Sequence, residues 1–314
     1  MRQRPVHASA SEHGRSLIEL MIVLAIGVSL SLGMVMLYSG SQNTVRTQHG
    51  AAYVADTGRH ALQVLSRQLR LAGYQRQVFY DSTWMQQPDD AFQSLFGCTG
   101  GFQDPAAAAP VCNNAAGQPD AFVVRYAVDV QENAGGPSAR TVAYDPVRSR
   151  GVDCLGNRMP EPADPANDPF VVENRYFMRT NAVSGRPELV CRGGATGAIL
   201  PIAEGVDDLV LRYSVDRVDT ASGGRDMSVD TFTRADGVGA NEWLWNDVTG
   251  ATNHSRSRRV LAVEICMVIR SMDKQPVGGQ RYLDCRANQV TATDAFYRQV
   301  FRSVVVMRNH VSAP

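Results

Sequence analysis

Glu19 is the residue whose position in this sequence most needs a chemical explanation. It lies near the start of an apolar run from Leu17 to Tyr38, and the next charged residue is Arg46. A carboxylate costs roughly 2.5–3.5 kcal/mol at the centre of a membrane helix, and less near its edge. We therefore expect Glu19 either to pair with a positive group in apolar surroundings or to extend toward the lipid headgroups.

The six cysteines form a second set with possible chemistry. No two of them form a C-x-x-C pair, and none lies in a Cys/His cluster with zinc-ligand spacing. An even number of scattered cysteines is typical of disulfides in an oxidising compartment, the alternative being six buried thiols. Short loops close most readily. Proximity therefore predicts, among many possible connectivities, the pairs Cys98–Cys112, Cys154–Cys191 and Cys266–Cys285.

Two further groups of residues have a functional and a structural interpretation. A group of four aspartates could bind calcium, but it lacks the spacing of a calcium-binding loop. We therefore favour a position for it at a solvent-exposed edge of the head. Two tryptophans two residues apart could form an exposed adhesive patch, but we favour packing in the core. These groups are Asp207, Asp208, Asp216 and Asp219, and Trp243 with Trp245. No hydrolase, zinc-protease or nucleotide-binding motif is present, so we expect neither an enzyme nor a bound cofactor or metal.

The segment that positions Glu19 has the length and composition of a membrane helix. After Glu19 the run holds nineteen consecutive uncharged residues, which would span about 30 Å as a helix, enough for a bilayer core. Arg2, Arg4 and Arg15 precede it, which predicts a cytoplasmic N-terminus and an external remainder. The run is longer than the apolar part of a secretory signal, and no A-x-A-like site follows it.

The residues around Glu19 also resemble a known processing signal. The stretch G-R-S-L-I-E-L, from Gly14 to Leu20, is similar to the class III signal of type IV prepilins and secretion pseudopilins. The resemblance implies cleavage by a prepilin peptidase between Gly14 and Arg15, N-methylation of Arg15, and a glutamate, Glu19, at the fifth mature position. The family usually has phenylalanine where this chain has Arg15.

The resemblance also suggests a role for Glu19. Cleavage would create an α-amine at Arg15, and the Glu19 carboxylate of a neighbouring subunit could pair with it inside a filament. Two buried charges are costly alone and tolerable when paired. Such a pair would set the register of otherwise featureless apolar helices.

A second helical pattern follows the apolar run. Beyond Ser39-Gly40-Ser41, which we expect to be flexible, small and apolar residues recur at three- and four-residue steps, and polar residues occupy the other side. Gly73 is the expected C-cap. The apolar stripe consists of Ala55, Gly58, Leu62, Leu65, Leu69 and Ala72, and the polar side of Arg59, Gln63, Arg67 and Arg70. We therefore expect a leader at 1–14, a transmembrane or filament-core helix at 15–40, and an amphipathic helix at 41–73.

The remaining residues, 74–314, are expected to form a β-rich periplasmic head. Residues 81–120 have the composition of loops, and two stretches rich in Pro, Gly and Asp separate the strand-like segments. Those segments are Ala121–Val130, Val171–Arg179, Val206–Asp216, Arg259–Arg270 and Gln299–Arg308. The pattern predicts an α+β fold, in which an antiparallel sheet packs on the amphipathic half of the long helix.

Several segments along the chain resemble the PilW family of type IV pilus minor pilins. They are TGRHALQVLSRQLRLAGY (57–74), GVDDLVLRYSVD (205–216), RRVLAVEICMVIRS (258–271) and FRSVVVMRN (301–309). This resemblance implies a minor pilin that primes or caps a filament and supports adhesion, twitching motility or DNA uptake. The alternatives are a type II secretion pseudopilin similar to GspJ and a membrane-anchored periplasmic enzyme.

The resemblance also implies partners and a location. The expected partners are other minor pilins, the major pilin, the prepilin peptidase and the inner membrane. The formal net charge of +0 does not indicate nucleic-acid binding. The protein is expected in the inner membrane before assembly, with one span and a periplasmic head, and in the pilus afterwards, at its tip.

Overall fold

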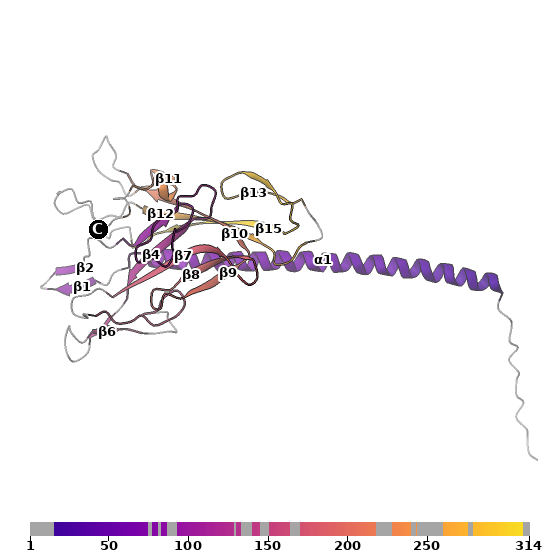
Figure 1. Ribbon diagram of the computed structural model, residues 1–314, viewed down its shortest axis with the longest axis horizontal. Helices are drawn as coiled ribbons and strands as arrows, with labels where there is room; N and C mark the ends of the chain where they lie inside the picture. The colour runs from indigo at the N-terminus through magenta and orange to yellow at the C-terminus, as the bar shows by residue number, and fades with distance from the viewer. Residues whose placement is uncertain are drawn as a thin grey trace, which may run out of the picture. The chain divides into compact units, whose positions relative to one another are not determined.

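The computed structural model describes residues 16–74, 77–80, 83–86, 93–128, 130–132, 140–144, 151–163, 170–217, 228–239, 243, 260–275 and 279–309. The chain divides into two compact units, Met1–His49 and Gly50–Pro314. Helix α1, Leu17–Leu71, contributes residues to both units (Figure 1). The leader residues, including Gly14, and Arg15 lie outside the described part.

In the first unit, α1 is continuous and exposed. The Ile18 N–H donates to the hydroxyl of Ser16, 3.4 Å away, which caps the start of the helix. Within the apolar run, the Ser29 and Ser31 hydroxyls donate to the carbonyls four residues earlier, at 2.8 Å, so neither hydroxyl is left unpaired. Among the described helices, α1 is the one long and apolar enough to cross a membrane.

Helix α1 continues through Ser39-Gly40-Ser41, as the long helix predicted up to Gly73 requires, and the flexibility expected at these three residues does not interrupt it. No proline removes a backbone donor there, and the Thr44 hydroxyl donates to the Gly40 carbonyl at 3.0 Å. A single glycine lowers helix propensity by roughly 1 kcal/mol, which does not interrupt a helix of this length.

In the second unit, α1 buries one stripe, slightly rotated from the predicted one. Val54 and Ala61 are buried, whereas the predicted Ala55 and Leu62 are half-buried. The rest of the buried stripe agrees with the sequence: Gly58, Leu65, Leu69 and Ala72. The polar side, Arg59, Gln63, Arg67 and Arg70, is exposed as expected.

Gly73 ends the helix in the way predicted for a C-cap. Its φ is +71°, in the left-handed region that glycine adopts without strain. Its N–H donates to the carbonyl of Arg125, 2.9 Å away, and so joins the helix end to a neighbouring strand.

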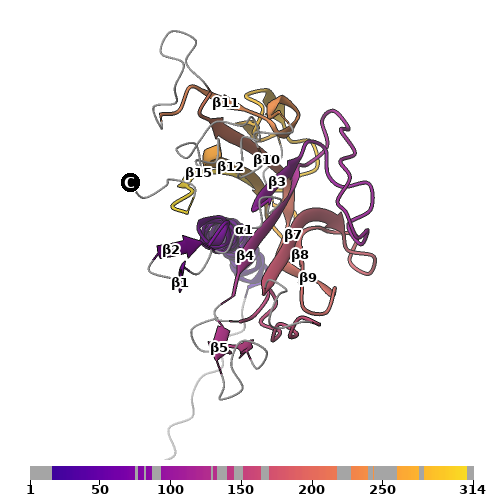
Figure 2. The ribbon, with the colours of Figure 1, turned by 90° about the vertical axis from the view of Figure 1, so that its left-hand side faces the viewer.

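Two antiparallel sheets pack against this half of the helix (Figure 2). The five-stranded sheet has the order β3-β4-β7-β8-β9, and the four-stranded sheet has the order β11-β10-β12-β15. The first consists of β3 Leu95–Cys98, β4 Ala121–Ala127, β7 Val171–Thr180, β8 Pro187–Arg192 and β9 Ile199–Glu204. The second consists of β10 Val206–Val215, β11 Thr231–Thr233, β12 Val260–Arg270 and β15 Arg298–Val306.

Gly205 joins the two sheets where β9 turns into β10. Its φ is +75°, its N–H donates to the Pro187 carbonyl at 2.8 Å, and its carbonyl accepts from Arg270 at 2.7 Å. One residue therefore bonds to a strand of each sheet, β8 in the first and β12 in the second, and the turn needs the conformational freedom of glycine.

Three small hairpins and a 3₁₀ turn complete the described elements. The hairpins are β1 Gln77–Tyr80 with β2 Thr83–Gln86, β5 Val130–Glu132 with β6 Arg140–Val142, and β13 Arg281–Leu283 with β14 Gln289–Thr291. The turn, η2, is Ala235–Gly237. Residues 81–120 are thus not all loop, because β2 and β3 form there.

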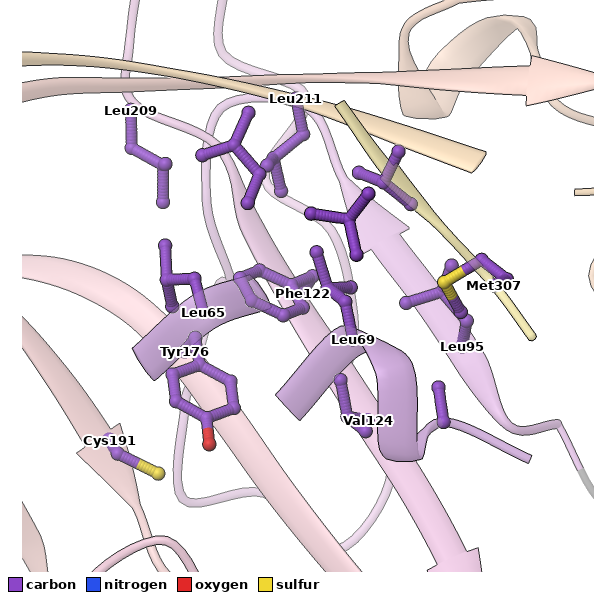
Figure 3. Close-up of a cluster of buried hydrophobic side chains, with 14 of the residues drawn as sticks. Leu65, Leu69, Leu95, Phe122, Val124, Tyr176, Cys191, Leu209, Leu211 and Met307 are labelled. Carbon is purple, nitrogen blue, oxygen red and sulfur yellow. The ribbon is translucent and has the colours of Figure 1, made fainter. Parts of the chain in front are cut away.

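The core lies between α1 and the inner faces of both sheets. Leu65 and Leu69 extend from the helix toward the strands, where Phe122 lies on β4 and Leu211 on β10 (Figure 3). All four side chains are fully buried. The Phe122 ring stacks on Tyr176 of β7 with ring centres 4.9 Å apart. The predicted α+β fold, with a long helix packed on antiparallel sheet, is confirmed.

Candidate functional site

Glu19 lies in the first turn of α1 with an exposed side chain. Its backbone N–H donates to the Ser16 carbonyl at 3.0 Å, while its carboxylate accepts no hydrogen bond from the described residues. A carboxylate at this position also interacts favourably with the helix dipole. Ser16 and Glu19 have the spacing of a capping box, a signal that the sequence analysis did not use.

The apolar surface around Glu19 has no partner among the described residues of the first unit. None of the most apolar stretch of α1 is buried, and its mean hydropathy is 2.5. Large side chains there are exposed, for example Leu24, Ile26 and Leu30. A surface of this extent is stable only in lipid or against another apolar surface, which is compatible with membrane anchoring.

The acidic pair Asp207 and Asp208 is not the solvated edge that the sequence suggested. A register shift between Val206 and Asp208 turns both carboxylates toward arginines. Asp207 pairs with Arg298, Nε–Oδ2 2.6 Å, and Asp208 pairs with Arg286. Asp216 is buried elsewhere in the core, and Asp219 lies outside the described residues.

These pairs are partly removed from water. Burial raises the pKa of Asp207 and of Asp208 above the usual value, by more than their arginine partners lower it. Because desolvation offsets much of their attraction, these ion pairs add little to the free energy of unfolding. Their effect is to hold the elements they join in fixed positions. Among the described residues, no group of His, Cys, Asp and Glu side chains has the arrangement of a metal site.

The favoured core position is confirmed for Trp243, which is buried. Its ring meets Tyr213 edge-on, with centres 4.8 Å apart, and Phe96 at 5.8 Å. Such edge contacts add about 0.5–1.5 kcal/mol beyond the area buried. Trp245 lies outside the described residues.

The structure contains three disulfides, Cys98–Cys112, Cys154–Cys191 and Cys266–Cys285. These are the pairs that proximity predicted. The first closes the loop after β3, the second joins residues 151–163 to β8, and the third ties β12 to the turn of the β13–β14 hairpin. Each bridge constrains a segment that has little regular structure of its own.

Arg175 is a structural anchor that the sequence analysis missed. Its side chain is 2% exposed, and it donates to the backbone carbonyls of Pro105 and Ala108, at 3.0 and 2.9 Å. It also pairs with Glu173 at 2.6 Å. Burial alone would raise the pKa of Glu173, but Arg125 and Arg175 together hold it below the usual value. This arginine holds the alanine-rich loop against the sheet.

A surface groove of about 720 Å³ lies between two segments that disulfides constrain. Its lining includes the aromatic side chains of Phe102, Phe177 and Tyr282, together with Val290 and Asp208. Its described lining mixes aromatic, aliphatic and acidic groups, which are groups suited to recognition of another molecule.

Comparison with known proteins concerns the head. The family model for Type IV Pilus-assembly protein W, PilW, matches residues 175–309, from Arg175 of β7 to the end of the described chain. Over these residues the chain is PilW-like. The PilW resemblance predicted from the sequence is therefore confirmed, and it includes both central strands of the four-stranded sheet, β10 and β12.

Among solved structures, one match has low similarity to this chain. A type IV-like pilin from Thermus thermophilus is 14% identical, with a TM-score of 0.39, over 82% of this chain and 97% of that one. No curated protein matches the chain. The PilW match and the long apolar helix packed on antiparallel sheet support a type IV pilus-related pilin.

Proposed function

We propose that the protein is a minor pilin that joins a type IV pilus assembly through its N-terminal helix and helps to prime or cap the filament. The exposed Glu19 carboxylate, which has no partner among the described residues and lies next to a long exposed apolar surface, carries this proposal. The PilW match supports a pilus assembly over a secretion pseudopilus.

In this mechanism, the peptidase cleaves after Gly14 and the new α-amine is at Arg15. Glu19 of one subunit pairs with the amine of a neighbour as their helices pack. Arg15 is four residues before Glu19, so its guanidinium competes for the same carboxylate within one helix. The head stays on the external side and contacts the other minor pilins and the major pilin.

The test is the substitution Glu19→Ala. Removing one partner of a buried charge pair leaves the other unpaired in apolar surroundings, which should weaken association by about a hundredfold or more. We expect the variant to be made, cleaved and inserted normally, but to recover few minor pilins in pull-down and to reduce pilus counts.

Two controls separate pairing from anchoring. Arg15→Phe removes the competing guanidinium and should preserve or increase assembly. Leu20→Ala changes the adjacent apolar side chain and should leave partner recovery within about twofold. Normal piliation and normal pull-down with Glu19→Ala would show that Glu19 has only a topological role.

A further inference from the structure

Strand β15 is an edge of the four-stranded sheet, and no described strand pairs with its outer side (Figure 2). It pairs with β12 from Arg298 to Val306 without a register shift, and it contains no proline. By contrast, β9 at an edge of the other sheet contains Pro201 and pairs with β8 across a register shift. Prolines and bulges block the addition of a further strand, so β9 is protected in a way that β15 is not.

Hydrogen bonds next to β15 show which of its backbone groups point outward. The Met307 N–H donates to the Leu261 carbonyl and the Ser271 N–H to the Tyr297 carbonyl, both at 2.8 Å. In an antiparallel ladder, bonding to a given neighbour alternates along the strand. The odd-numbered residues of β15 therefore bond to β12, and the N–H and C=O groups of Arg302, Val304 and Val306 point to the open side.

One outward position at the start of the strand already has a partner. The Gln280 side-chain amide accepts from the Arg298 N–H and donates to the Arg298 carbonyl, each at 2.7 Å. This pair of bonds is the one that a peptide group of an adjacent strand would form. At Arg298 the Gln280 side chain therefore takes the place of a neighbouring strand. The open part of the edge begins after this residue.

The open part has an apolar outer surface. Val304 and Val306 are each 55% exposed, on the same face of the sheet. An added strand would cover both side chains and pair with the backbone groups beside them. Main-chain hydrogen bonds supply affinity in this mode of recognition, and alternate side chains supply specificity.

On the helix side of the sheet, two arginines of α1, Arg59 and Arg70, lie at or next to backbone positions that contact β15 or the residues directly after it. Arg59 directly follows Gly58, which meets the Phe301 ring of β15, and the Arg70 carbonyl accepts from the Asn309 amide at 2.9 Å. Both arginines are exposed, and no described acidic residue forms an ion pair with either. A second copy of this chain would bring the same positive groups against them, which disfavours self-pairing and favours an acidic partner.

We propose that the open edge of β15, from Arg302 to Val306, binds an extended acidic segment of another protein, which adds a fifth strand to the four-stranded sheet. The inference rests on the edge geometry and the adjacent arginines, and it does not depend on the proposed pilus function.

The probe is a labelled ten-residue peptide of alternating valine and glutamate, titrated against the full chain in detergent and followed by fluorescence anisotropy. Val304→Pro removes one outward N–H that takes no part in the ladder with β12, so the fold should persist. We expect it to weaken binding at least tenfold, whereas Val304→Thr, which keeps the N–H, should change binding less than threefold. Circular dichroism and the thermal midpoint report whether each variant is folded.

A second arm needs no change in the protein. A peptide methylated on alternate backbone nitrogens cannot form the ladder and should not bind, and a peptide with lysine in place of glutamate should bind at least tenfold more weakly. Arg59→Glu with Arg70→Glu should reverse that preference. Failure of the acidic peptide to bind at millimolar concentration, equal binding of the methylated peptide, or dimers of the chain that form through β15 would each overturn the proposal.

Discussion

Gly58 is a residue at which α1 packs closely against β15. A Cβ atom there would overlap the Phe301 ring, so the side-chain hydrogen of glycine is what permits the contact. Glycine normally lowers helix propensity by about 1 kcal/mol relative to alanine. At this position that loss is offset by close packing of the helix on the strand.

Gly58→Ala should therefore lower the free energy of unfolding of the head by about 1 kcal/mol, because overpacking by roughly 1–3 kcal/mol exceeds the gain in helix propensity. In a Phe301→Leu background the same change should instead raise stability by up to about 1 kcal/mol. Denaturant unfolding of the four proteins measures the coupling. An equal effect in both backgrounds would contradict the contact.

At the scale of elements, the loop between β3 and β4 is ordered by three devices: the Cys98–Cys112 bridge, the Arg175 guanidinium, and buried Asp120, which accepts from the Gly100 and Leu211 N–H groups at 3.1 and 2.9 Å. None of them is regular secondary structure. The bridge and Asp120 belong to the loop itself, whereas the Arg175 guanidinium comes from a strand distant from it in the sequence.

Arg175→Met should lower the free energy of unfolding by about 3–5 kcal/mol, because it leaves the carbonyls of Pro105 and Ala108 without their buried donor and Glu173 with Arg125 as its remaining partner. The matched change Arg158→Met removes an exposed pair with Glu161, 3.3 Å apart, and should stay within about 0.5 kcal/mol. Thermal unfolding at neutral pH compares the two. Similar losses for both variants would show that the Arg175 contacts add no particular stability.

These elements also show what the sequence was able to predict. The burial stripe of α1, the Gly73 cap and five strand segments follow from periodicity, because each is set by neighbouring residues. The short strands β3 and β11 could not be predicted, since pairing with β4 and β10 defines them more than their own composition does. Likewise, nothing local to Arg175 indicates that its partners lie near residue 107.

At the scale of the whole molecule, two parts of one chain require different surroundings. The first unit exposes apolar side chains from Leu17 to Tyr38, while the second unit has a closed core and three disulfides. Removal of residues 1–14 would leave the apolar helix at the very start of the mature protein, with Glu19 near the new terminus.

Co-expression with a prepilin peptidase should therefore shorten the chain by residues 1–14 and leave Arg15 at the N-terminus. Gly14→Ala should block the cleavage, because the resemblance places the scissile bond after this glycine, while the neighbouring change His13→Ala should permit it. Mass spectrometry of the purified proteins distinguishes the outcomes. An intact N-terminus on filament-associated wild-type protein would refute the processing.

None of the three disulfides involves α1. The helix from Gly50 to Leu71 is held to the sheets by packing and hydrogen bonds, with its covalent link to the head only at its C-terminal end. A pulling force applied at the start of α1 would therefore be resisted by shear of side chains such as Leu65 and Leu69 past the strands. The disulfides would keep the sheets and loops of the head intact while the helix slid past them. Reducing agents should therefore lower the force that the head withstands, without changing the force at which the helix first slides.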